Sequence, residues 1–88
     1  MSKLQFLEKA WEQYVYWQTQ DSRTLKKLNK LITDISRNGN TGIGHPEELK
    51  GNLAGWWSRE IDEKNRLVYK IENDVIIVLR CKNHYDDK

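Results

Sequence analysis

Cysteine is almost missing from this 88-residue chain, which has a single one at position 81. One thiol excludes a disulfide within the chain, and the apolar run around Cys81 predicts a buried, unreactive side chain. No apolar stretch approaches the roughly 20 residues of a membrane helix, and no signal-peptide pattern opens the sequence. We therefore expect a cytoplasmic protein that makes no contact with a membrane.

Metal-ligand patterns and net charge are also scarce. The only histidines, His45 and His84, have no Cys or His partners at ligand spacing, so we expect neither a metal nor another cofactor. The formal net charge is +2, although 32% of the residues are charged. This balance permits RNA binding without requiring it, because the attraction of phosphate depends on local clusters of cations.

Large aromatic side chains are common instead, with four Trp and four Tyr. A chain this short buries a modest part of its surface, so these rings are expected to supply much of the core. The length predicts a single domain over residues 1–88, in which residues 86–88 form a flexible tail.

The first half of the sequence has the periodicity of two helices. A short strand is expected at residues 3–7, followed by a helix over about 7–20 whose aromatic residues recur near one face. Asp21 or Ser22 is the expected N-cap of a second helix, and the very short connection predicts an antiparallel helical hairpin. The apolar stripe of the second helix is Leu25, Leu28, Ile32 and Ile35, with Leu31 beside it.

The second half has the signals of loops and strands. The glycine-rich segment 38–44 predicts a loop, and Pro46 predicts a short helical turn over 47–50. Strands are expected at 56–61, 66–72 and 75–82. The last of these is nearly all apolar, which indicates burial on both faces. Helices followed by a strand meander predict an α+β fold, in which two N-terminal helices pack on one face of a small antiparallel sheet and leave the other face free for a ligand.

Three side chains in this half could cut RNA without a metal. In such a reaction a base takes the proton of the 2′-OH, a cation stabilises charge on the phosphate, and an acid protonates the departing 5′-oxygen. Glu47 is the candidate base, Arg66 the cation and His84 the acid. Imidazole suits the last role because it titrates near neutrality.

Further residues are candidates for substrate contacts. Lys50 and Arg59 could hold phosphate, and Tyr85 could stack on a base. Ordinary structural roles compete with these functions: a glutamate favoured in a first helical turn, or an arginine in a surface salt bridge. Taken alone, Glu47 and Arg66 are better explained by such roles, and His84 is balanced between the two explanations.

Several motifs in one order and spacing resemble the YoeB-type toxins of the RelE/ParE superfamily, which belong to type II toxin–antitoxin systems. They are the aromatic helix Trp11–Gln18, Lys27–Ile32, Gly44–Lys50, Leu53–Arg59, Asn65–Tyr69 and His84-Tyr85. The resemblance covers nearly the whole chain. It implies a fold of the microbial ribonuclease type and a metal-independent endoribonuclease that cleaves messenger RNA in the ribosomal A site.

The resemblance also implies roles for individual residues. Glu47 falls on the family's general base, His84 on its general acid and Arg66 on its phosphate-binding arginine, while Lys50 and Tyr85 match residues that line the site. The implied partners are a cognate antitoxin, the ribosome with its messenger RNA, and a second copy in a homodimer. Operator DNA would be bound only through the antitoxin complex.

Three features depart from the family pattern. Glu60 stands where a second arginine is usual, the turn 63–65 lacks a frequent histidine, and residues 86–88 extend the chain beyond His-Tyr. Strand alternation predicts that Glu60 and Arg59 lie on opposite faces. These departures leave open a non-cleaving member that binds the ribosome or the antitoxin, and a plain RNA-binding module is a third alternative.

Overall fold

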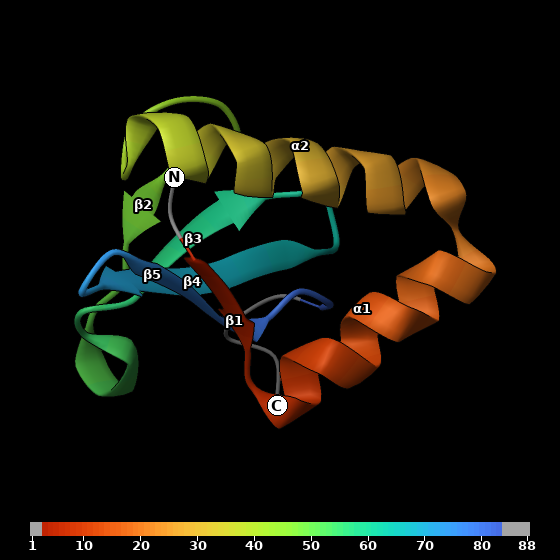
Figure 1. The fold of residues 1–88 in the computed structure, drawn as a ribbon, viewed down its shortest axis with the longest axis horizontal. Helices are drawn as coiled ribbons and strands as arrows, with labels where there is room; N and C mark the ends of the chain where they lie inside the picture. The colour runs from red at the N-terminus through yellow and green to blue at the C-terminus, as the bar shows by residue number, and fades with distance from the viewer. Residues whose placement is uncertain (1–2, 84–88) are drawn as a thin grey trace.

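The computed structural model describes residues 3–83, and His84, Tyr85 and the expected tail at 86–88 lie outside the described residues. Figure 1 shows two successive helices above and beside a twisted sheet. None of the described helices is long and apolar enough to cross a membrane. The elements are β1 (Lys3–Phe6), α1 (Glu8–Gln20), α2 (Ser22–Asn38), β2 (Glu47–Glu48), a 3-10 turn η1 (Gly51–Leu53), β3 (Trp57–Glu60), β4 (Arg66–Glu72) and β5 (Val75–Arg80).

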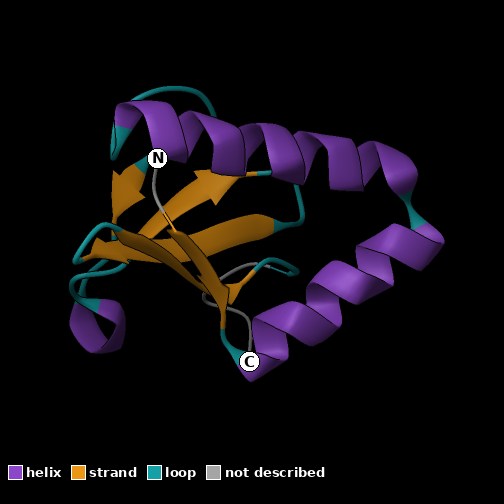
Figure 2. Ribbon diagram, viewed as in Figure 1, coloured by secondary structure: helices purple, strands orange, loops and turns teal. Residues whose placement is uncertain are grey.

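The strands form one five-stranded sheet in the order β1-β5-β4-β3-β2. β2, β3, β4 and β5 are antiparallel to their neighbours, whereas β1 joins β5 in parallel. A parallel pair requires a long crossover, and both helices lie within this one (Figure 2). The structure therefore confirms the predicted α+β fold, with one parallel edge strand added to the antiparallel sheet.

Asp21 separates the two helices, as predicted. Its backbone is extended (φ −156°), and its Oδ1 accepts a hydrogen bond of 3.1 Å from the backbone N–H of Thr24. An aspartate in this position satisfies an N–H that has no partner inside the helix. The helices diverge from Asp21 (Figure 1), so they form an open V rather than a close-packed hairpin. A hydrogen bond of 2.7 Å from the Tyr14 hydroxyl to Asn29 Oδ1 bridges them.

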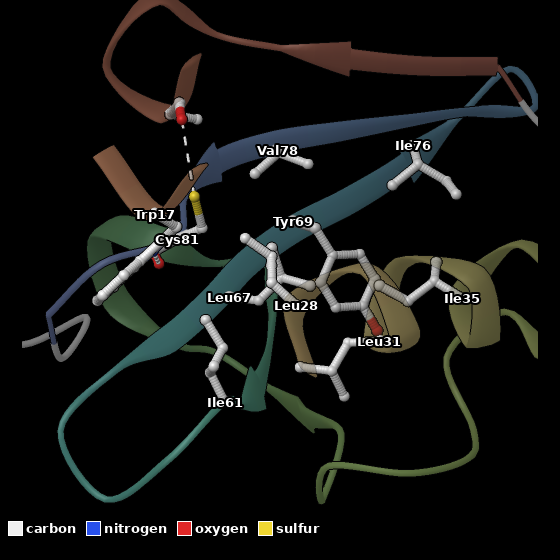
Figure 3. Packing of buried hydrophobic residues seen from close by; sticks show 11 residues of the cluster. Trp17, Leu28, Leu31, Ile35, Ile61, Leu67, Tyr69, Ile76, Val78 and Cys81 are labelled. Atoms are coloured by element: carbon white, nitrogen blue, oxygen red, sulfur yellow. Dashed lines mark hydrogen bonds between the residues drawn. The ribbon is translucent and has the colours of Figure 1, made fainter. Parts of the chain in front are cut away.

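The core lies between the two helices and one face of the sheet, and α1 contributes Ala10 and Trp17 to it (Figure 3). Leu28, Leu31 and Ile35 of α2 are buried, whereas Leu25 and Ile32 of the predicted stripe are only partly buried. Leu31 is thus central to the buried stripe, with Leu28 three residues before it and Ile35 four residues after it. The sheet contributes Leu67, Tyr69, Ile76 and Val78 to this cluster.

The prediction of a helical turn over residues 47–50 is wrong. Glu47 and Glu48 form β2, in which Glu47 pairs with Ser58 and Glu48 with Trp57. The helical turn comes later, at η1. The edge of β3 offers unpaired backbone groups, and their hydrogen bonds override the local signal of Pro46.

The prediction that the last strand is buried on both faces is also wrong. Ile76 and Val78 of β5 are buried, but Val75 and Ile77 are only partly buried. The helices cover one face of the sheet only, so residues that alternate along β5 have different surroundings. The central strand of the sheet is β4, in which three successive residues, Leu67, Val68 and Tyr69, are fully buried.

Candidate functional site

Strand register brings four positions from four strands into one row across the sheet. Glu47 pairs with Ser58, Ser58 with Val68, and Val68 with Arg80. Directly paired residues lie on the same face of a sheet. The next row contains Tyr69 and Val78, which belong to the core beneath the helices, so the Glu47–Arg80 row lies on the opposite face. The helices do not cover this face, which we call the open face, but Ser58 and Val68 in the middle of the row are fully buried.

Arg66 lies on the open face as well. It stands two residues before Val68 in β4, and side chains two apart in a strand share a face. The predicted base in β2 and the predicted phosphate-binding cation in β4 therefore lie on the same face of the sheet, with β3 between their strands. The strand partner of Arg66 is Glu60, the residue that departs from the family pattern.

Glu47 and Lys50 are neighbours on the rim of a surface hollow. Both side chains are exposed, and the hollow has a volume of about 390 Å³. Its lining is Glu47, Glu48, Leu49, Lys50 and Leu53. The hollow thus places the candidate base beside Lys50, one of the cations predicted to contact phosphate.

The described chain ends next to Arg66. The backbone N–H of Arg66 donates a 3.0 Å hydrogen bond to the carbonyl of Asn83, and the N–H of Asn83 donates a 2.7 Å hydrogen bond to Asn65 Oδ1. Asn83 is the residue before His84, the predicted acid. The two predicted site residues at the C-terminus, His84 and Tyr85, lie outside the described residues.

Arg59 does not have the predicted role in phosphate binding. Its side chain is fully buried, and all five of its N–H donors have acceptors within the protein. Nε donates to the Tyr69 hydroxyl at 3.2 Å. The two terminal nitrogens donate to Asp34 Oδ2 and to the carbonyls of Gly39, Thr41 and Ile43.

The reason for this correction is the face on which Arg59 lies. It pairs with Leu67, a core residue, so the alternation of β3 turns it towards α2. There its guanidinium ties the loop after α2 to the sheet, because it donates hydrogen bonds to the carbonyls of Gly39, Thr41 and Ile43. The hydrogen bond from Arg59 lowers the pKa of Asp34 below its ordinary value. Sequence could not distinguish this buried arginine from Arg66.

Glu60 lies on the face opposite to Arg59, as predicted. Its Oε1 is 3.1 Å from Nδ1 of His45, and its backbone N–H donates to the carbonyl of Gly44 at 2.7 Å. The carboxylate therefore has two cationic or potentially cationic neighbours, His45 and its strand partner Arg66. The negative charge that Glu60 brings to this position is thus next to His45 and Arg66, which can balance it.

Two residues of the open face had no functional prediction from the sequence. The Ser58 side chain is fully buried, and its Oγ has no hydrogen-bond partner within residues 3–83. Arg80 reaches the open face through a register irregularity between β4 and β5. Neither feature leaves a signal in the sequence, because both depend on which residues the sheet places side by side.

Comparison with known proteins identifies the class. Residues 6–85 match the family model described as a YoeB-like toxin of bacterial type II toxin-antitoxin systems. The chain is 47% identical over 83 residues to Toxin YoeB of Escherichia coli K12, across 94% of this chain and 99% of that toxin. The chain is therefore a toxin of a type II toxin–antitoxin system.

Solved structures agree with this class. A YoeB-YefM complex from Staphylococcus aureus superposes with a TM-score of 0.90 at 42% identity, covering 97% of this chain and 99% of that one. A YoeB dimer from the same organism gives a TM-score of 0.89 at 44% identity, covering 96% and 98%. The chain belongs to the YoeB toxin family, as its motifs predicted.

Proposed function

We propose that this toxin is a metal-independent endoribonuclease that cleaves messenger RNA on the ribosome and so inhibits translation in the cytoplasm. One observation carries the proposal: Glu47 and Arg66 share the open face, and the chain that leads to His84 is hydrogen-bonded beside Arg66. A carboxylate, a guanidinium and an imidazole are the three groups that cleavage by the RNA's own 2′-OH requires.

The proposed reaction is an in-line transfer within the RNA. The Glu47 carboxylate takes the proton of the 2′-OH while O2′ forms a bond to phosphorus. The bond from phosphorus to O5′ breaks, and His84 gives its proton to the departing oxygen. The products are a 2′,3′-cyclic phosphate and a 5′-OH. Arg66 stabilises the negative charge that builds on the non-bridging oxygens.

Supporting contacts complete the proposed site. Lys50 is placed beside Glu47 on the same hollow and is suited to hold a neighbouring phosphate. Tyr85 is proposed to stack on a base of the single-stranded message. The ribosome presents the message in its A site, which lowers the entropic cost of ordering a flexible substrate.

A cognate antitoxin and a second copy of the chain are the proposed protein partners. The relatives from Staphylococcus aureus form a complex with YefM and a dimer, which supports both partners. The exposed apolar side chains on β1 and α1 are suited to such contacts. They are Leu4, Trp11, Val15 and Tyr16. Operator DNA is proposed to bind only through the antitoxin complex.

The test is cleavage of a defined message in a translation reaction with purified ribosomes, mapped by primer extension. Substitutions Glu47→Gln and His84→Gln should each slow cleavage by about 10²–10⁴-fold. Glu48→Gln is the matched control, because Glu48 is adjacent in β2 but lies on the other face. Wild-type protein that leaves the message intact, or cleavage that survives both substitutions, would refute the proposal.

Glu60 supports a second candidate, a non-cleaving member that binds the ribosome or the antitoxin. A carboxylate directly opposite Arg66 weakens the positive field at the proposed phosphate position. This candidate predicts inhibited translation with an intact message in the same reaction. If the wild-type protein does not cleave the message but Glu60→Arg does, the negative charge of Glu60 is the cause of the missing cleavage.

A further inference from the structure

The helix α2 concentrates the positive charge of the chain. Its sequence contains one acid, Asp34, and five cations, which are Arg23, Lys26, Lys27, Lys30 and Arg37. Five cations and one acid give the helix a formal charge of +4, whereas the whole chain has +2, so the rest of the chain carries −2. A local field of one sign on a nearly neutral protein indicates a surface for an oppositely charged partner.

The five cations form one strip along the helix, which we call the basic strip. At 3.6 residues per turn they fall within an arc of about 100°, and the distance along the axis from Arg23 to Arg37 is about 21 Å. Lys27 is partly buried and the other four are exposed. The strip is separate from the buried stripe of α2, so the core holds the helix while leaving these cations on the surface.

The basic strip lacks acidic partners. Within residues 3–83, no ion pair involves Lys26, Lys27, Lys30 or Arg37. The Asp34 carboxylate accepts hydrogen bonds from the buried guanidinium of Arg59 and from two other donors, so its charge is already balanced. Cations three or four positions apart destabilise a helix, whereas an ordinary solvated helix face alternates both signs. A bound polyanion removes this repulsion.

A surface hollow lies at the C-terminal end of the basic strip. Its volume is about 290 Å³, and it is lined by Lys30, Thr33, Asp34, Arg37 and Ile43. Two of these residues are cations of the strip, and Thr33 adds an exposed hydroxyl that can donate a hydrogen bond. The hollow thus offers a phosphate group three donors from one helix.

The chemistry of the basic strip favours nucleic acid over protein as its partner. Protein interfaces are poor in lysine and have large apolar side chains at their centre, whereas nucleic-acid interfaces are polar and strongly basic. Within the described part of the chain, none of the large exposed apolar side chains lies on α2. Four of the six are on β1 and α1, the surface proposed above for protein partners.

The basic strip and the open face are on opposite sides of the molecule. α2 covers the core face of the sheet, so the core and the sheet separate the strip from Glu47 and Arg66 (Figure 1). The nucleotides at the proposed site therefore cannot also contact the strip, and a second stretch of RNA is required. Double-stranded RNA suits a row of cations because proteins recognise it mainly through its shape and its phosphates.

We propose that the basic strip binds the phosphate backbone of double-stranded ribosomal RNA, and so holds the toxin on the ribosome while the open face holds the message. This inference rests on the proposed function, because it assigns a contact with the ribosome that the proposed function requires. The strip is a docking surface, and none of its residues transfers a proton.

The experiment measures binding of the full chain to purified ribosomes without message, over a series of salt concentrations. Lys26→Gln combined with Lys30→Gln should weaken binding more than about tenfold, and should lower the slope of log affinity against log salt by about 2, since each lost phosphate contact contributes about 0.9. Arginine at both positions should keep the slope, because it keeps the charge. Lys3→Gln combined with Lys9→Gln is the matched control: both lysines are exposed and outside α2, and the slope should not change.

Cleavage kinetics give a second measurement. The double glutamine variant of α2 should need a higher ribosome concentration for half-maximal cleavage and should keep the maximal rate, because docking contributes equally before and during the reaction. Thermal melting of each variant separates binding from folding. Glutamine has nearly the helix propensity of lysine, so these exposed changes should leave the Tm close to that of the wild type.

Equal slopes in the α2 variant and its control overturn the inference, and so does a wild-type chain that does not bind ribosomes. If the α2 variant instead loses binding to poly-glutamate or to a DNA duplex, with its ribosome binding unchanged, the inference is also overturned. A reduced slope combined with an intact message in the translation reaction supports the inference and refutes the proposed cleavage. Cleavage by the wild type with equal slopes gives the opposite result.

Discussion

Arg59→Lys tests whether Arg59 is a structural residue or an RNA contact. The guanidinium donates five hydrogen bonds from a fully buried position, whereas an ammonium has only three donors. At least two hydrogen bonds are lost. At a net contribution of about 1 kcal/mol each, the free energy of unfolding falls by about 2 kcal/mol. For a domain of this size, this lowers the Tm by about 8–16 °C.

The loss is large compared with the total stability. At about 0.05–0.15 kcal/mol per residue, a chain of this length is stable by roughly 4–13 kcal/mol. Thermal unfolding followed by circular dichroism measures the change directly. Arg37→Lys is the matched control, since Arg37 is exposed in the last turn of α2 and the same substitution there should shift stability by less than about 0.5 kcal/mol.

RNA binding gives the second measurement. Under conditions where Arg59→Lys is folded, its salt dependence of RNA binding should equal that of the wild type, because Arg59 has no donor left for phosphate. A variant with an unchanged Tm and weakened RNA binding would refute this assignment. It would mean that Arg59 leaves its buried position to contact RNA.

Three further predictions concern stability and reactivity. Ser58→Ala should raise the free energy of unfolding by about 1–3 kcal/mol, because it removes a buried hydroxyl that has no hydrogen-bond partner among residues 3–83; a loss of stability in urea titrations would contradict this. The pKa of Asp34 is lowered by its hydrogen bond from Arg59. Its ionised form therefore stabilises the fold above the unfolded value near 4, and this stabilisation is lost as the pH falls towards the lower folded value. In Asp34→Asn, the free energy of unfolding should therefore fall less steeply as the pH is lowered below about 4. The same pH dependence in the variant and the wild type would exclude this role for Asp34. Burial raises the pKa of Cys81 to about 12, so a thiol reagent at pH 8 should react only when the protein unfolds. Rapid labelling of native protein would show that the thiol is accessible.

Local signals in the sequence were sufficient for much of the fold. The alternation from Arg66 to Glu72 predicted β4 with the bounds that the structure has. Asp21 predicted the break between the helices, because an aspartate can cap a helix with its own side chain. The segment 47–50 shows the limit of such signals, since its conformation is set by hydrogen bonds to β3, a strand that comes later in the chain.

The sequence by itself determined the fold class and the family, and it predicted a candidate site that includes Glu47 and Arg66. These conclusions follow from hydrophobic periodicity and from motifs in a fixed order, both of which are local or cumulative along the chain. Only the tertiary structure decided which arginine is buried and which lies on the open face. Arg59 and Arg80 each belong to a β-strand, yet one is buried among five acceptors and the other is moved to the open face by a bulge. Register and burial are properties of paired strands, and no single segment contains that information.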